Sequence, residues 1–324
     1  MPAIRDIDIL VVGEINPDLV VADDDPVPAF GEVERLVRSI RLTVGSSSAI
    51  FAVGAARLDL RVSFVGVVGD DPLGRFMLEA MAARGVDVTA CTVDPQRPTG
   101  ATVILTSGRD RAMLTAMGTI GALDVGTVAD AMLDRARHLH LGCYYLQTAS
   151  LDRLPAFFAR ARARGVSTSF DTNWDPSERW DGGIEEMLRS CDVFLPNAAE
   201  ASRIAHREDV EDAARELARI GRVGRSDGGP IIAVKCGPSG ALAVGRDDQV
   251  VRVPALPVTA VDTTGAGDSF NAGFLRSWLD GGSIREALRL GAVCGALSTL
   301  GLGGIDAQPT ADAAFDALRR WPDA

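Results

Sequence analysis

The strongest constraint on the fold is the way in which short apolar runs alternate with longer amphipathic segments. Apolar and β-branched residues fill short runs at 7–12, 62–68, 139–141, 166–170, 193–195 and 231–234. Strands that alternate with helices pair in parallel, and strands covered on both faces are almost continuously apolar. The pattern therefore predicts an α/β fold with a doubly wound, mostly parallel sheet and helices on both of its faces.

Two regions, 17–44 and 98–117, interrupt this alternation. They contain strand-like segments at 19–22, 36–44, 101–106 and 112–116, without a helix of ten residues between neighbours. We expect these segments to form a small antiparallel sheet that projects from the main domain as a lid, and lids exclude water from sites of group transfer. No linker divides the chain, so residues 1–324 are expected to form one domain, with helices near its end at 266–279, 284–297 and 311–320.

Charge and cysteine content narrow the possible partners. The formal net charge is −11 and the pI is about 4.8, which disfavours binding to nucleic-acid phosphates or anionic membranes. No apolar stretch is long enough to predict a membrane span. The five cysteines are widely spaced and odd in number, as expected of free thiols in a reducing compartment. The sequence therefore predicts a cytoplasmic protein without nucleic-acid or membrane partners.

The motif with the clearest chemistry is Val-Asp-Thr-Thr-Gly-Ala-Gly-Asp at 261–268, where a helical pattern begins. Small residues at Gly265, Ala266 and Gly267 allow backbone amides to converge at a helix N-terminus, which is a site for a phosphate or a developing anion. Asp268 lies in the first helical turn and could accept the proton of an attacking hydroxyl. Taken alone, these residues also fit a tight turn followed by an acidic residue that favours the helix dipole.

This stretch resembles the C-terminal signature D-T-x-G-A-G-D-x-F of the ribokinase-like (PfkB) carbohydrate kinases. The resemblance implies an enzyme that uses ATP and Mg²⁺ to phosphorylate a hydroxyl of a sugar or a sugar-like small molecule. It assigns Asp268 as the base and the amides of 265–267 as the anion hole. It also implies that Asp262 and the carbonyl oxygen of Thr264 hold a monovalent cation such as K⁺, and that the protein forms a homodimer through its lid.

Two other kinds of phosphate-binding loop are not found in the sequence. The pattern G-x-x-x-x-G-K-[ST] of P-loop enzymes occurs nowhere, and its Lys and Ser or Thr are required for that chemistry. The first predicted strand ends in Gly-Glu-Ile-Asn at 13–16, without the G-x-G-x-x-G of a dinucleotide site. The sequence therefore argues against a P-loop enzyme and against a nicotinamide-dependent dehydrogenase.

The segment Gly-Glu-Ile-Asn-Pro-Asp at 13–18 is similar to the family's G-x-x-N-x-D, in which the Asn and the Asp bind acceptor hydroxyls. The resemblance therefore assigns Asn16 and Asp18 to the acceptor. A carboxylate can accept two hydrogen bonds from a vicinal diol, as a sugar or a ribose moiety would offer. As a bare sequence, Asn-Pro-Asp is also a common turn.

The segment Gly-Ser-Ser-Ser-Ala-Ile at 45–50 departs from the family's G-G-x-x-x-N. In the family the second Gly lets the backbone approach the acceptor and the Asn binds its hydroxyl. Ser46 and Ile50 replace these two residues, so Gly45, Ser46 and Ser48 are the remaining candidate acceptor contacts. The serines also suit the N-terminus of a helix.

The segment Asp-Thr-Asn-Trp-Asp-Pro at 171–176 is similar to the family's D-x-N-x-R and assigns Asn173 to the substrate site. Trp174 and Asp175 stand where many relatives have the Arg that binds phosphate. A phosphate contact is therefore expected from elsewhere, and Arg111 in the proposed lid is one candidate.

Two further segments resemble the nucleotide-binding parts of the family. Asn197 and Glu200 match an N-x-x-E motif in which the Glu organises Mg²⁺-bound water and the Asn lies near the nucleotide. Lys235, Gly237 and Gly240 match a K-x-G-x-x-G motif that lies beside ATP. By spacing alone, the first is a helix capping box and the second a hairpin turn.

The strand near residue 140 carries His138 and His140 on one face, followed by Cys143. A zinc site needs three or four ligands, and no partner has suitable spacing, so we expect packed histidines. Strand ends at a topological switch point line ligand sites. Three residues after this strand are therefore expected to line the acceptor pocket: Tyr144, Tyr145 and Gln147.

Three functions remain open from the sequence. The first is a carbohydrate kinase, and the second is a nucleoside kinase of the same family, because ribose offers the same diol to Asp18. The third is a catalytically silent nucleotide- or sugar-binding protein, which the departures at 45–50 and 174 would suit. The complete Gly-Ala-Gly run and Asp268 favour a kinase, and the acceptor stays undetermined.

Overall fold

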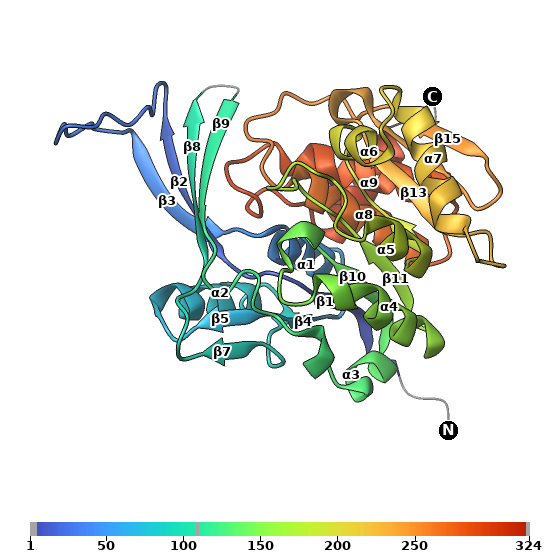
Figure 1. Cartoon of the computed structure of the whole chain (residues 1–324). Coiled ribbons are helices and arrows are strands. Elements are labelled where there is room, and N and C mark those ends of the chain that lie inside the picture. The colour runs from blue at the N-terminus through green and yellow to red at the C-terminus, as the bar shows by residue number, and fades with distance from the viewer. Residues whose placement is uncertain (1–4, 108–109, 322–324) are drawn as a thin grey trace.

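The computed structural model describes residues 5–107 and 110–321. In this part of the chain a nine-stranded sheet forms the centre, in the order β15-β14-β13-β12-β11-β10-β1-β4-β6 (Figure 1). Adjacent strands from β13 to β6 are parallel, and β14 is antiparallel to both of its neighbours. The strands are β1 (Ile7–Val12), β4 (Val62–Val65), β6 (Val86–Asp87), β10 (Ala136–Leu141), β11 (Ser167–Phe170), β12 (Val193–Phe194), β13 (Ile231–Lys235), β14 (Ala241–Val244) and β15 (Val250–Val253).

Helices cover both faces of this sheet, and each face has its own apolar core. In β1, Leu10 and Val12 belong to one core while Ile9 and Val11 belong to the other, since successive side chains alternate between faces. The first core packs under α3 (Asp130–Arg135), α4 (Leu154–Ala163), α5 (Ile184–Ser190), α6 (Ala198–Ala205) and α7 (Val210–Arg222). The second packs under α1 (Ser47–Arg57), α2 (Pro72–Ala82), α8 (Ala266–Leu279), α9 (Ile284–Ser298) and α10 (Ala311–Arg320). The predicted doubly wound α/β fold is confirmed.

Local sequence signals explain where these helices begin. The Asp71 side chain caps α2, with Pro72 in its first turn, and α9 begins with a capping box between Ser283 and Glu286. Smaller elements complete the chain: β5 (Val67–Gly69) paired with β7 (Thr92–Asp94), and 3₁₀ helices at Val125–Thr127, Tyr144–Leu146, Leu151–Arg153 and Gly237–Ser239. Among the described residues, no helix is both long and apolar enough to cross a membrane.

A separate four-stranded sheet projects from the main body (Figure 1, left). Its order is β3-β2-β8-β9, with β2 (Pro17–Asp23), β3 (Ser39–Val44), β8 (Ala101–Ser107) and β9 (Asp110–Ala116). The prediction of an antiparallel sheet is wrong for its central pair, because β2 and β8 are parallel. Each of these two strands is the first strand of a hairpin that leaves the body, so the two run in the same direction side by side.

The pairing register gives this sheet two different faces. Asp18 lies opposite Thr43 and Thr102, and all three are buried, so this inner face looks toward the body. The alternate positions form an outer face, on which Ile40 and Leu114 are 61% and 63% exposed. The outer face consists of Leu19, Val21, Ile40, Leu42, Val103, Leu105, Ala112 and Leu114.

Candidate active site

The candidate site lies where the order of the main sheet reverses direction. After β1 the chain adds β4 on one side and then β10 on the other. Ligands of doubly wound sheets bind at the carboxyl ends of strands beside such a switch point. The segments that follow β1, β10, β11, β12 and β13 meet there with the start of α8, because side chains from these segments hydrogen-bond one another.

The turn before α8 provides backbone N–H groups at a helix N-terminus. Gly265 has a φ of 70°, and a Cβ there would lie 2.8 Å from the carbonyl oxygen of Gly304, so only glycine fits. The amide of Ala266 donates to the carbonyl oxygen of Thr263 at 3.3 Å. In the described residues, the amides of Gly265 and Gly267 have no hydrogen-bond acceptor. Two amides of the turn are therefore available to an anion.

Asp268 is buried directly beside this turn, in the first turn of α8. Burial raises its pKa well above the ordinary value, and the nearby charge of Asp171 raises it further. Lys235 and a hydrogen bond with the Ser47 side chain act in the opposite direction. The carboxyl thus lies close to Ser47, in the predicted acceptor segment (45–50), and to Lys235, in the predicted nucleotide segment (235–240), and its proton affinity is increased.

Asp18 lies on the inner face of the projecting sheet, where burial raises its pKa to about 7. The positive charge of Arg111 lowers this pKa and the negative charge of Glu14 raises it. A Cβ at Gly45 would lie 2.7 Å from the backbone nitrogen of Asp18 and closer still to its carboxyl. Glycine at position 45 is therefore required for the approach of these two segments. Asn16 is also buried beside them.

Glu14 is a buried carboxylate that the sequence analysis did not single out. Its Oε2 accepts hydrogen bonds from the hydroxyl of Ser48 at 2.7 Å and from Nε2 of Gln147 at 3.2 Å. The hydroxyl of Ser46 donates to the Glu14 carbonyl oxygen at 2.6 Å and lies 3.1 Å from its Oε1. Both serine hydroxyls are thus bonded to Glu14, which ties the 45–48 turn to the end of β1.

In the 171–175 segment, Asn173 contacts the residues around Asp268, and none of the five residues is basic. Asn173 has a φ of 53° and its amide hydrogen-bonds the Ser47 hydroxyl, the same group that bonds Asp268. Trp174 packs instead against Trp180 and the guanidinium of Arg203.

The nucleotide segment borders a pocket of about 460 Å³ beside α8. Its lining includes Lys235, Gly237 and Gly240 together with Ala266 and Gly267 from the turn and the start of α8. Mostly apolar walls of this kind suit a planar base, and the amides of the turn lie at its edge. The remaining wall residues are Pro238, Ala255, Leu256, Pro257, Val258, Ala260, Thr263, Phe270, Ala292, Gly295, Ala296 and Thr299.

The ammonium group of Lys235 joins a buried network at the edge of this pocket. Its Nζ lies 2.5 Å from Oδ2 of Asp171 and 3.3 Å from Oδ1 of Asn271. The amide of Asn271 donates to the same Asp171 oxygen at 2.6 Å. Asn271 follows Asp268 by three residues and lies on the same face of α8, so this helical spacing was a signal that could have identified it.

Glu200 begins α6 as part of a capping box and is also part of this cluster. Asn197 donates to its carboxylate through the backbone N–H at 2.9 Å and the side-chain amide at 2.6 Å. Burial and the charge of Asp171 raise its pKa, while Lys235 lowers it. The helix capping box and the predicted role near Mg²⁺ therefore involve the same carboxylate of Glu200.

Comparison with known proteins gives a match to the pfkB family of carbohydrate kinases over residues 6–311. The chain belongs to this family. A curated ATP-dependent ribose-1-phosphate kinase from Halopiger xanaduensis is 31% identical over 94% of this chain and 96% of the relative. A nucleoside kinase from Methanothermobacter thermautotrophicus is 30% identical over 88% and 87%. The crystal structure of a putative ribokinase from Agrobacterium tumefaciens has a TM-score of 0.85 at 24% identity, covering 97% of this chain and 98% of that chain.

This pfkB family member departs from the family pattern at Ser46, where the usual residue is Gly. Ser46 has a φ of 67°, a region that glycine adopts more readily than any other residue. Its hydroxyl also accepts a hydrogen bond from the N–H of Ala49 and so caps α1. The bonds to Glu14 and Ala49 offset the backbone strain that a side chain causes here.

The predicted cation site of this pfkB protein holds together the loop before α8. Oδ1 of Asp262 accepts hydrogen bonds from the N–H and the hydroxyl of Thr264 at 2.9 and 2.8 Å. Oδ2 accepts one from the N–H of Gly303 at 2.8 Å. Arg111 of β9 donates to the Thr264 hydroxyl at 3.1 Å, so the projecting sheet reaches this loop.

The expectation that Tyr144 and Tyr145 line the acceptor pocket is wrong for this family member. Both rings belong to the core beneath α4 and α5, and the Tyr144 hydroxyl donates to the Gly182 carbonyl oxygen. Gln147 alone of the three turns toward the site, where it contacts Glu14. His138 and His140 are packed as expected, with ring nitrogens bonded to the hydroxyl of Ser169.

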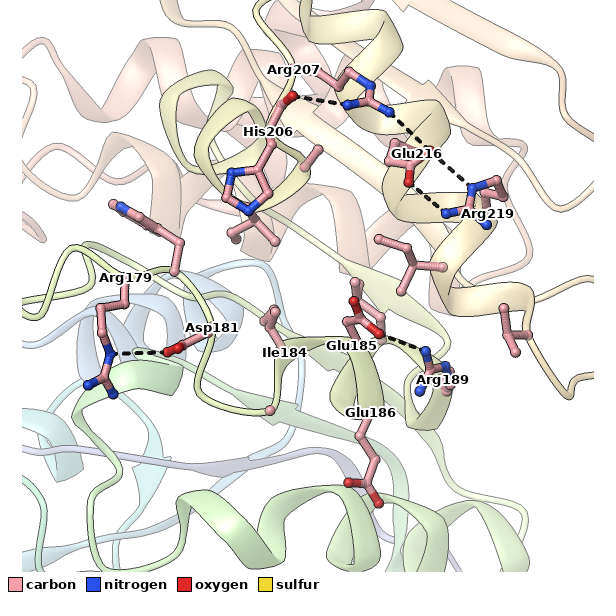
Figure 2. Close-up of a pocket in the computed structure, with 17 residues that line it drawn as sticks. Arg179, Asp181, Ile184, Glu185, Glu186, Arg189, His206, Arg207, Glu216 and Arg219 are labelled. Carbon is pink, nitrogen blue, oxygen red and sulfur yellow. Dashed lines mark hydrogen bonds and ion pairs between the residues drawn. The ribbon is translucent and has the colours of Figure 1, made fainter.

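A second pocket of about 630 Å³ lies between α5, α6 and α7 (Figure 2). Several of its charged side chains pair with one another: Arg179 with Asp181, Glu185 with Arg189, and Glu216 with Arg207 and Arg219. None of the residues that the sequence assigned to phosphoryl transfer lines it. The residues that the sequence assigned to nucleotide binding border the smaller pocket beside α8 instead, through Lys235, Gly237 and Gly240.

Proposed function

We propose that this protein is an ATP-dependent kinase that transfers the γ-phosphoryl group to a hydroxyl of a sugar or sugar-like small molecule. The observation that carries the proposal is the position of Asp268. Its buried carboxyl lies beside the open amide of Gly267 and between the acceptor and nucleotide segments. Phosphoryl transfer depends chiefly on positioning and charge stabilisation, and these groups supply both.

In the proposed reaction, Asp268 accepts the proton of the acceptor hydroxyl. The acceptor oxygen forms a bond to the γ-phosphorus while the bond from that phosphorus to the β–γ bridging oxygen breaks, and ADP leaves with the electron pair. The amides of Gly265 and Gly267 would stabilise charge on the transferred group. Asp18 orients the acceptor by accepting hydrogen bonds from adjacent hydroxyls.

The carboxylate chemistry of the cluster fits Mg²⁺, the metal that the family implies. No group of three or more acidic, His or Cys side chains in residues 5–107 and 110–321 could enclose a metal ion. Mg²⁺ keeps several waters and uses few carboxylates together with substrate phosphates, so Glu200 and the nucleotide would hold it through water. When bound, Mg²⁺ would neutralise charge on the phosphates.

The proposal is tested by a panel assay of ATP consumption and product formation. The acceptors are pentoses, hexoses, sugar acids, nucleosides and ribose 1-phosphate, the last two because curated relatives are named for them. Activity with any acceptor supports a kinase, and preference for nucleosides over free sugars would favour a nucleoside kinase. If ATP binds but no acceptor is phosphorylated, the silent binding protein is the correct interpretation.

The pH profile of acceptor use is a first prediction. Because the pKa of Asp18 is raised to about 7, the carboxyl becomes protonated as the pH falls below 7 and can accept fewer hydrogen bonds. We therefore expect kcat/KM for the acceptor to fall on the acid side of pH 7. Asp18→Asn should weaken acceptor use and remove this contribution, leaving the pH dependence of Asp268. An unchanged profile shape in Asp18→Asn would contradict the assignment.

We also propose a homodimer in which the outer faces of two projecting sheets pack together. A group of exposed apolar side chains on one face, as on this outer face, is typical of an interaction site. Leu114→Glu is expected to convert dimers to monomers in light scattering because it places a charge on this face. Val223→Glu is the matched control, since Val223 is 52% exposed but lies outside the sheet. Equal masses for wild type and Leu114→Glu would contradict this arrangement.

Three further parts of the proposal concern organisation and ions. Residues 1–324 would act as one domain, with 17–44 and 98–117 as a lid that closes over the acceptor, as the contact of Arg111 with Thr264 supports.

K⁺ would bind near Asp262 and Thr264, and a comparison of reaction rates in K⁺ and in Na⁺ would test this. A cytoplasmic location suits the cysteines, all of which are free thiols.

A further inference from the structure

Lys235 is the single lysine of the chain. The sequence has 33 basic residues, of which 32 are arginine. Lysine is a compact point charge on a flexible stem, whereas arginine is a planar fork, so the two are not interchangeable at a tight site. A chain that uses arginine everywhere else therefore has a compact ammonium group at one place, the edge of the nucleotide pocket.

This ammonium group lies between two possible partners. On one side it contacts Asp171 at 2.5 Å, in an ion pair whose side chains are 12% and 2% exposed. On the other side a Cβ placed on Gly267 would be 3.5 Å from Nζ. The ammonium group is therefore next to the open amide of Gly267 as well as to Asp171.

We propose that Lys235 changes partner during the reaction, leaving Asp171 to contact the transferred phosphoryl group of ATP. It would supply the positive charge that an Arg at 174 or 175 supplies in many relatives. This inference rests on the proposed kinase function and adds a catalytic residue to it. Lys235 keeps its proton throughout, and the acceptor proton goes to Asp268.

The surroundings of Lys235 suit such an exchange. A buried ion pair gains little net energy because both charges lose their hydration, so a phosphate with more negative charge can compete for the ammonium group. Asp171 would keep the hydrogen bond from the amide of Asn271 at 2.6 Å after the lysine leaves. Burial lowers the pKa of Lys235, but Asp171 and Glu200 outweigh this and keep it above the ordinary value.

Arg111 is the competing source of positive charge. It contacts Thr264 and lowers the pKa of Asp18, which places it on the acceptor side. Lys235 lies on the nucleotide side, in the wall of the pocket that also contains Gly237 and Gly267. Loss of Lys235 is therefore expected to weaken binding of a triphosphate, whereas loss of Arg111 is expected to weaken binding of the acceptor.

The direct test uses the fact that one lysine gives one signal. In protein labelled with ¹⁵N at the lysine side chain, the Nζ resonance reports Lys235 alone. We expect it to shift on addition of Mg²⁺ with a non-hydrolysable ATP analogue, and to change little with adenosine, which fills the base site without phosphates. Equal shifts with both ligands, or no shift with the bound triphosphate, would overturn the proposal. This readout needs neither a known acceptor nor turnover.

Kinetics and binding of Lys235→Met and Lys235→Arg provide the second test. Lys235→Met is expected to lower kcat by about 10²- to 10³-fold and to weaken the ATP analogue about tenfold or more, with adenosine affinity retained. Lys235→Arg should recover only part of this loss, because the fork does not fit the space of an ammonium group. If analogue and adenosine weaken equally in Lys235→Met, the pair with Asp171 is structural only. A loss of analogue binding in Arg111→Met but not in Lys235→Met would assign the role to Arg111.

Failure of this inference differs from failure of the proposed function. The wild type could be active and lose turnover in Asp268→Asn, while its lysine resonance does not shift with the triphosphate. That result would support the kinase function and contradict only the role of Lys235. A wild type that phosphorylates no acceptor in the panel would remove the kinase itself.

Discussion

Asp268→Asn is expected to lower kcat by about 10²- to 10⁴-fold, the usual contribution of a positioned general base. Asparagine has nearly the same shape but cannot accept the acceptor proton. Binding of ATP should change little, because the amides of the turn and the apolar pocket remain. Steady-state kinetics with the best acceptor, together with calorimetry of ATP binding, measure both effects. Near wild-type turnover would remove Asp268 from the mechanism.

The stability of the same variant gives an independent check. Folding raises the pKa of Asp268, so its ionised form destabilises the native state at pH values above the unfolded pKa. Replacement with asparagine should therefore leave the unfolding temperature unchanged or raise it, even as turnover falls. Asp312→Asn is the matched control, because Asp312 is an exposed acidic residue in the first turn of α10. It tests the helix-dipole contribution alone and should not alter turnover.

Gly267→Val is expected to lower kcat/KM for ATP by about 10²- to 10³-fold, comparable to the loss of a backbone donor at an anion hole. The atoms nearest to a Cβ at this position belong to the Lys235 side chain and lie at ordinary contact distances, so the fold has room for it. The branched methyl groups of valine would extend into the space between the turn and the ammonium group. The loss should therefore appear in ATP binding, which calorimetry measures, while the variant remains folded.

Gly267→Ala separates occlusion from a change in helix stability. Alanine is more favourable than glycine in a helix by about 0.5–1 kcal/mol, so this variant should unfold at the same or a higher temperature. Its ATP affinity should lie between those of wild type and Gly267→Val because it adds only the Cβ. If valine and alanine reduced activity in proportion to a loss of stability, the open space at Gly267 would not be the phosphate site.

Much of the fold could be predicted because its signals are local. Apolar runs such as 231–234 are buried on both faces and gave the order of strands and helices. The starts of the C-terminal helices were also predicted correctly, and α9 ends one residue later than expected, at Ser298. The parallel pairing of β2 with β8 could not be predicted, because it joins segments that are some 80 residues apart and depends on where each hairpin leaves the body.

The candidate site divides in the same way. Motifs such as Gly265–Asp268 and Asn197–Glu200 carry short-range patterns, and the structure brings both of them close to Asp171 and Lys235. The contacts of Glu14 with Ser48, and of Lys235 with Asp171, depend on side chains from different strands and helices meeting in three dimensions. No spacing in a single sequence specifies such contacts. Tyr144 was misplaced for a related reason, since its 3₁₀ helix turns the ring back into the core.

The two-sided character of the projecting sheet has a consequence for how this protein can change. Asp18 and Leu19 are adjacent in β2, yet their side chains leave the strand in opposite directions. If Asp18 orients the acceptor and the outer face forms the dimer, as proposed, substitutions at every second position would alter acceptor choice and those in between would alter self-association. On that proposal, substrate preference and quaternary structure could change independently of each other, because the two faces of one four-stranded sheet would carry them separately.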